Sequence, residues 1–314
     1  MNARIASEVL RPAGAAPARA PAASARVVPA RLEPREAGAI LDLAVEGLLA
    51  RLGPALAFAL CLFVPFHQVS ELLGLSGLDG FAADLVGLGW NLAVLVPTGL
   101  TASVVVSLVG DALVDRRAPV GPGIARGLAR GVGAILLLVA TQMATLPLMF
   151  LCIAPYFLAQ WLTWAAVPIF VLEGDALLTQ AERARASRSA LAYLAGIPLR
   201  LVRALRRSVD LTRGAPSLGR WILLALVGQL ALAGMLDWGA VGLTQPESRE
   251  FLRAELGLSS AAVDLALGAL AALFAALSAC LRAALMVAFY LDLRVRREGW
   301  DLELALARAP EARA

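Results

Sequence analysis

The chain has 314 residues, of which 60% are apolar and 17% charged, and its mean hydropathy is +0.75. Soluble domains carry about 25% charged residues, so this composition excludes an ordinary soluble globular protein. The net charge of +4 includes 28 basic residues, all arginine, which fall mostly beside apolar stretches. This pattern favours anionic lipid headgroups over nucleic acid as partners.

In chain order, residues 1–35 come first, and 22 of them are Ala, Arg or Pro. We expect this segment to be an uncleaved, disordered cytoplasmic tail. A membrane domain is predicted over residues 36–304, followed by a second cytoplasmic tail at 305–314. Its first helix has Leu41, Val45, Leu48 and Leu52 on one face, which is typical of a helix at the membrane interface.

A long uncharged stretch is the main evidence for membrane-spanning helices. Residues 131–172 form a run of 42 residues without one Asp, Glu, Lys or Arg. A helix needs about 20 apolar residues to cross a bilayer, so the run fits two crossings and a tight return. Pro147 and Pro155 lie near its middle, where the chain is predicted to turn back.

The same reasoning along the chain predicts an all-α integral membrane protein, a bundle of six transmembrane helices with basic amphipathic helices on the cytoplasmic side. A bend is expected in the second span at Pro97 and Gly99. The six spans are predicted at about 53–69, 84–110, 131–149, 153–172, 221–236 and 262–291.

Arginine placement orients these spans. With both termini in the cytoplasm, 25 of the 28 arginines lie inside, two (Arg249 and Arg253) lie outside, and Arg282 falls within the sixth span. The Ala-, Leu- and Arg-rich composition suggests a GC-rich bacterial genome. We therefore predict a multi-pass protein of the bacterial cytoplasmic (inner) membrane.

Two basic inner segments are predicted to contact lipid. In a helix ending near Thr212, Leu201, Val202, Leu205 and Val209 share a face and the arginines lie mostly off it, as in a helix on a membrane surface. Charged residues also follow the sixth span. The candidate headgroup contacts are Arg200, Arg203, Arg206, Arg207, Arg294, Arg296 and Arg297. Glu173, at the end of the fourth span, is expected to pair with arginines of either segment.

Polar residues at membrane depth form a second candidate site. Arg282 is expected to face the bundle and to meet a polar partner, as a structural pair or as a ligand site, because an unpaired charge there costs at least about 2.5 kcal/mol. The alternative is that the span ends near Leu281, which leaves Arg282 at the interface. Uncharged polar residues of the spans most often join helices by hydrogen bonds. The residues of this candidate site are Arg282, Asn91, Gln142, Gln160 and Gln229.

The sequence offers no catalytic constellation. His67 is the single histidine, and Cys61, Cys152 and Cys280 lie far apart within apolar runs. Metal hydrolysis, a Ser-His-Asp triad and a Cys-His pair all lack the residues they need. We therefore predict no catalytic residues, no metal site and no cofactor.

Five short motifs resemble those of a known bacterial family, and the ending is the most specific of them. They are ILD at 40–42, VLEG at 171–174, ALRRS at 204–208, LTRG at 211–214 and YLDLRVRREG at 290–299. Together they resemble the membrane domain found on some glycerophosphoryl diester phosphodiesterases and in stand-alone proteins. In this chain 33 residues separate Gly174 from Ser208, where the family pattern has roughly one helix. The catalytic barrel of such enzymes is not implied, because it needs paired histidines.

Three functions stay open. The first is a non-catalytic membrane module that associates with lipid or with other envelope proteins. The second is a transporter or permease with an intramembrane site around Arg282, and the third is an intramembrane transferase acting on lipid-linked substrates.

Overall fold

A computed structural model describes residues 37–72, 89, 92–115, 118–151, 153–186, 189–213, 250–251, 253–255, 257 and 259–299. In these parts of the chain the regular structure is helical, and no strand occurs among them. The helices are α2 (Ala37–Leu49), α3 (Leu52–Leu72), α5 (Leu95–Val114), α6 (Val120–Leu151), α7 (Ile153–Thr163), α8 (Ala166–Glu173), α9 (Gln180–Ala186), α10 (Ala190–Ala195), α11 (Ile197–Arg213) and α14 (Ser260–Glu298). The prediction of an all-α fold is therefore confirmed for the described residues.

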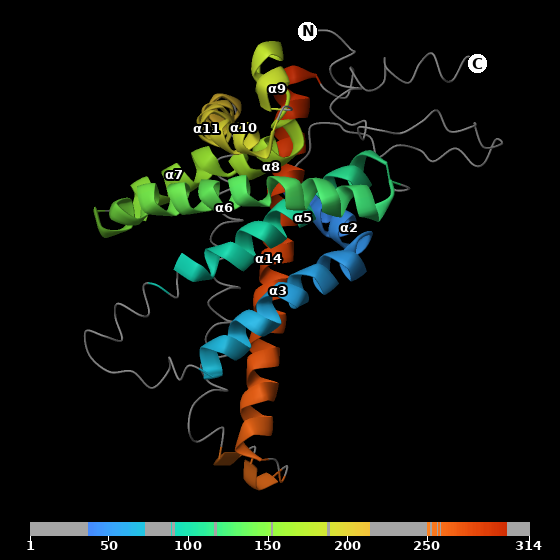
Figure 1. The fold of residues 1–314 in the computed structure, drawn as a ribbon, viewed down its shortest axis with the longest axis vertical. Coiled ribbons are helices and arrows are strands. Elements are labelled where there is room, and N and C mark those ends of the chain that lie inside the picture. The colour runs from blue at the N-terminus through green and yellow to red at the C-terminus, as the bar shows by residue number, and fades with distance from the viewer. Residues whose placement is uncertain are drawn as a thin grey trace, which may run out of the picture.

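The long helix α14 organises the molecule and runs along its long axis (Figure 1). Its N-terminus is capped by the side chain of Ser259, whose Oγ accepts a hydrogen bond from the backbone N–H of Ala262 at 3.3 Å. It ends at Gly299, which has a φ of 60°, a left-handed conformation that glycine adopts without strain. The half of α14 nearest its C-terminus is buried from Ala283 to Leu293, so this half forms the centre of the core.

The helices α2, α3 and α5 pack against α14, and α5 packs against α6. The backbones of α5 and α6 come very close, because a Cβ added at Gly127 of α6 would lie 2.5 Å from Cα of Val104. At the same crossing the hydroxyl of Ser103 donates a hydrogen bond to the carbonyl oxygen of Gly127. A small residue and a hydroxyl at the contact are typical of helix pairs that pack in lipid.

Four helical segments are long and apolar enough to cross a membrane: Leu52–Val69, Leu95–Val114, Val120–Thr145 and Ser260–Glu298. They overlap the predicted first, second, third and sixth spans. The predicted fifth span, 221–236, lies outside the described residues, as do residues 84–88 of the second. The chain is thus an all-α protein with helices that fit a bilayer by length and composition.

The predicted fourth span, 153–172, differs from the structure. It consists of two shorter helices, α7 and α8, separated by a turn at Trp164 and Ala165. Both turn residues are buried, and the hydroxyl of Ser208 on α11 donates a hydrogen bond to the carbonyl oxygen of Leu162, at 2.7 Å, in the last turn of α7. Packing against α11 therefore accompanies a break that hydrophobicity alone does not reveal.

The stretch between the predicted second and third spans, residues 111–130, is helical from Val120, where α6 begins. Two arginines of this segment lie within the helix, and carboxylates offset both. Arg126 is 2.7 Å from Asp111 and Arg130 is 2.7 Å from Asp175.

The predicted reversal near Pro147 and Pro155 is confirmed. Pro147 lies inside α6, which ends at Leu151, and α7 begins at Ile153. The side-chain amide of Gln160 on α7 reaches back to donate a hydrogen bond to Thr145 Oγ1 on α6, at 3.2 Å. The two helices therefore lie side by side, and Figure 1 shows the pair running across α14 instead of along it.

Candidate functional site

A buried carboxylate joins three helices at the end of α8. Glu173 is 7% exposed, and its Oε1 accepts a hydrogen bond of 2.5 Å from the hydroxyl of Tyr290 on α14. Arg294, one turn further along α14, lies 3.4 Å from the same carboxylate, and Arg207 of α11 lies 3.6 Å from its other oxygen. The prediction that Glu173 pairs with arginines of both inner segments is confirmed.

Glu298 completes this network. Its Oε2 is 3.0 Å from Arg294 Nε, and its Oε1 accepts a hydrogen bond from Arg207. Two arginines thus face two carboxylates, and each arginine contacts both. Such mutual pairing offsets the cost of removing these charges from water.

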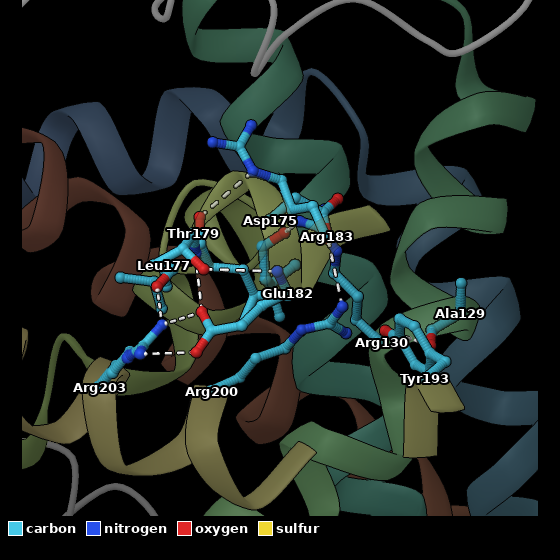
Figure 2. A network of polar contacts seen from close by, with 12 residues as sticks. Ala129, Arg130, Asp175, Leu177, Thr179, Glu182, Arg183, Tyr193, Arg200 and Arg203 are labelled. Carbon is cyan, nitrogen blue, oxygen red and sulfur yellow. Dashed lines mark hydrogen bonds and ion pairs between the residues drawn. The ribbon is translucent and has the colours of Figure 1, made fainter. Parts of the chain in front are cut away.

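A second network lies on the loop between α8 and α9, and Figure 2 shows it from close by. Arg203 of α11 binds Glu182 through two hydrogen bonds of 2.7 and 3.0 Å, and it also donates to the carbonyl oxygen of Leu177 at 2.8 Å. Thr179 and Glu182 form a capping box at the start of α9, because each accepts a hydrogen bond from the other's backbone N–H. The hydrogen bonds from Arg203 first, and then that from the Thr179 backbone, lower the pKa of Glu182 to about 2.

Asp175 lies on the same loop and is shared by two arginines. Its carboxylate is 2.7 Å from Arg130 and 3.7 Å from Arg200 (Figure 2). The guanidinium carbon of Arg200 lies 4.3 Å from the ring centroid of Tyr193, a cation–π arrangement. Arg200 is only 3% exposed, so it holds the loop to α11 and does not reach the surface.

A hollow of about 370 Å³ opens between this loop and α11. Its lining includes three arginines and two carboxylates, which gives it one net positive charge. The lining residues are Glu173, Ala176, Leu177, Arg203, Arg206, Arg207 and Asp210.

Most of the charges around the hollow are already paired. Arg203 is held by Glu182, and Arg207 is held by Glu173 and Glu298. Arg206 and Asp210, one turn apart on α11, are both exposed, and neither makes an ion pair or a side-chain hydrogen bond within the described part of the chain. No described residue therefore occupies these two groups, which line the hollow.

Apolar side chains are exposed next to the hollow. Leu194 of α10 and Leu199 of α11 are exposed, and Val202 of α11 is 62% exposed. The buried residues of α11 are Ile197, Arg200, Ala204, Ser208, Leu211 and Thr212. Of the residues predicted to share an apolar face, Leu201 and Leu205 pack partly against the core, whereas Val202 is exposed.

The predicted headgroup contacts fall into two groups. Arg200, Arg203, Arg207, Arg294 and Arg296 all form ion pairs with carboxylates, Arg296 with Asp292 at 2.6 Å. Arg206 and Arg297 are exposed and form no ion pair among the described residues. The sequence shows the positive charges and the i,i+4 partners within α14, Asp292 and Glu298, whereas the partners of Arg200, Arg203 and Arg207 lie on other elements.

The predicted intramembrane site is only partly described, because Asn91 and Gln229 lie outside the described residues. The guanidinium carbon of Arg282 lies 5.7 Å from the ring centroid of Trp164, and its Nε is buried without a hydrogen-bond partner. Gln160 binds Thr145, and no hydrogen bond joins Arg282 to Gln142 or Gln160 in the described structure. Arg282 therefore lies over an aromatic ring, and its polar partner at membrane depth stays a prediction.

Histidine and cysteine chemistry adds no site in the described residues. His67 lies between Phe63 and Phe66, with ring centroids 6.4 and 6.0 Å away. No three His, Cys, Asp or Glu side chains of the described segments lie close enough together to hold a metal ion.

The described helices and the charged network together define the class: an all-α protein whose longest helices fit a membrane and whose charged groups gather where α8, α11 and the end of α14 meet. A comparison of the chain with family models, curated proteins and solved structures gives no match.

Proposed function

We propose that this chain is a non-catalytic module of the bacterial inner membrane that binds lipid headgroups through the hollow beside α11. In this proposal the chain crosses the membrane six times, both termini are cytoplasmic, and the hollow lies at the cytoplasmic interface. The membrane domain of glycerophosphoryl diester phosphodiesterases remains the proposed family resemblance, carried by the motifs at 171–174 and 290–299.

The observation that carries the proposal is the position of Arg206. It lines a hollow in which Arg203 and Arg207 are already paired, and it has no carboxylate partner of its own in the described chain. An unpaired guanidinium at an anionic leaflet gains about 1 kcal/mol, and it can bind a phosphate through two hydrogen bonds. The exposed Leu199 and Val202 on the same helix supply apolar surface for the acyl region.

Lipid binding to the purified full-length protein tests this proposal. Phospholipid is titrated into the detergent-solubilised protein, and bound lipid is counted by native mass spectrometry. We expect Arg206→Gln to lower occupancy about threefold, the effect of one exposed charge contact. Arg213→Gln is the matched control, because Arg213 is exposed on the same helix but does not line the hollow. Equal occupancy in both variants would refute the hollow as the lipid site.

Transport is the second candidate function, and one observation favours it. Arg282 Nε and Trp164 Nε1 are both buried without hydrogen-bond partners, and the Trp164 side chain is only 2% exposed. A bound anion would satisfy two such donors, whereas leaving each unsatisfied costs about 1–3 kcal/mol. Transport predicts that proteoliposomes take up organic anions and that Arg282→Met abolishes the uptake. Absence of uptake by the wild-type protein would refute the transport function.

A further inference from the structure

Among the described residues, internal pairing leaves one cation and one anion in the lining of the hollow without a partner. Glu173 accepts a hydrogen bond from Tyr290 and forms ion pairs with Arg294 and Arg207. Arg203 is held by Glu182. What remains is the guanidinium of Arg206 and the carboxylate of Asp210.

Arg206 and Asp210 are neighbours on α11 that do not form an ion pair with each other. They are four residues apart on α11, so their Cβ atoms are about 6 Å apart on one face of the helix. An Arg and an Asp at this spacing often form an ion pair, yet none is formed here, although both line the hollow. A ligand that carries both charges would be bound at its two ends.

We propose that the hollow selects a phosphoethanolamine headgroup, with the phosphate on Arg206 and the ammonium on Asp210. This inference rests on the proposed function and names its ligand. A phosphodiester accepts hydrogen bonds from a guanidinium fork, and a primary ammonium donates them to a carboxylate. Two carbons separate these groups in ethanolamine, a length suited to neighbouring residues of one helix face.

The same contacts distinguish phosphoethanolamine from other lipid headgroups. Phosphocholine carries a positive charge but has no N–H to donate, so Asp210 gains only a diffuse attraction. Phosphoglycerol has no cation, and its negative charge meets an uncompensated carboxylate. Phosphatidylethanolamine is therefore preferred over both.

The test is a competition on the full-length protein in detergent. Equimolar phosphatidylethanolamine, phosphatidylcholine and phosphatidylglycerol with identical acyl chains are added, and bound species are counted by native mass spectrometry. We expect phosphatidylethanolamine to be bound about threefold over each of the others, the effect of one exposed charge pair. Asp210→Asn should remove that preference, whereas Arg206→Gln should lower the binding of all three.

Two controls separate the possible outcomes. Asp42→Asn removes an exposed carboxylate of α2 that does not line the hollow, and it should leave the preference intact. Soluble glycerophosphoethanolamine, added as a competitor, should displace the lipid if the free headgroup suffices, and should fail if the acyl chains are required.

A preference that survives Asp210→Asn would overturn the ethanolamine assignment and leave the lipid site standing, provided that Arg206→Gln still lowers binding. If Arg206→Gln has no effect either, the hollow does not bind lipid and both proposals fail. Thermal unfolding of each variant in detergent shows whether the fold is retained.

Discussion

Glu173 differs from the other acidic residues of the site because it is buried and because its partners come from two other helices. Its carboxylate faces the Tyr290 hydroxyl, Arg294 and Arg207. A buried acid in this position compensates two guanidinium groups that have only one further carboxylate, Glu298, to share. The side chain therefore matters for the assembly of the site even if no ligand touches it.

Replacing Glu173 by Gln should destabilise the protein by about 3 kcal/mol, because two partly buried guanidinium groups lose one of their two counter-charges. Unfolding in detergent, followed by tryptophan fluorescence, measures the change. Asp210→Asn is the matched control, since Asp210 is exposed and pairs with no described residue, and it should change stability by less than about 0.5 kcal/mol. A Glu173→Gln protein as stable as the wild type would show that the network does not hold the helices.

Glu182 gives a prediction about pH. Its pKa in the folded protein is about 2, below its ordinary value of 4.5, because Arg203 donates hydrogen bonds to it. An acid with a lowered pKa stabilises the folded state above its unfolded pKa, and this stabilisation is lost as the pH falls through the folded pKa. We expect the contact between α9 and α11 to weaken between about pH 4.5 and pH 2.

Hydrogen exchange of the α9 and α11 amides over this range measures the effect. In Glu182→Gln the pH dependence should flatten, because no carboxylate is left to protonate. The same slope in the variant would assign the transition to another group.

At the scale of the helices, the crossing of α5 and α6 depends on the absence of a side chain at Gly127. A Cβ there would lie 2.5 Å from the Val104 backbone, and backbone cannot rotate away as a flexible side chain can. Gly127→Ala should therefore force the two helices apart and cost about 2 kcal/mol. Gly121→Ala, on the same helix but with nothing within 4 Å, should be neutral or slightly stabilising in the same unfolding measurement. Equal stability of the two variants would contradict the close approach.

Sequence reasoning succeeds for elements defined by local composition. The reversal between α6 and α7 follows from two prolines within an uncharged run, and the charged end of α14 follows from its residues alone. Sequence reasoning is less successful where the structure depends on ion pairs between residues far apart in the sequence. Arg126 and Arg130, between the predicted second and third spans, lie in α6 and pair with Asp111 and Asp175, and these pairs are not visible in the local sequence.

The same reasoning explains what was missed at the site. The sequence predicts that four arginines of α11 face lipid, but three of those four are paired with Asp175, Glu182 and Glu173. Those partners lie at the end of α8, on the following loop and in the first turn of α9, and no local pattern shows that this segment folds onto α11. The spacing of Arg206 and Asp210 is visible in the sequence, whereas their lack of partners is a property of the fold.

At the scale of the whole molecule, α14 should present its two ends to opposite sides of the membrane. Thirty-nine helical residues extend about 58 Å, about twice the hydrocarbon thickness of a bilayer. Single cysteines at Gly257 and Arg297, in a background without Cys61, Cys152 and Cys280, test this with a membrane-impermeant thiol reagent on intact cells. We expect labelling at 257 only, and labelling at both positions or at 297 alone would overturn the topology.

The helix α14 is continuous over its whole length and contains no proline. The segment from Ala283 to Leu293 is buried among neighbouring helices. The N-terminal part of α14 is buried less completely, whereas Tyr290 and Arg294, which contact Glu173, lie within or directly after the buried segment. The contacts of Glu173 are therefore made where neighbouring helices hold α14 most firmly.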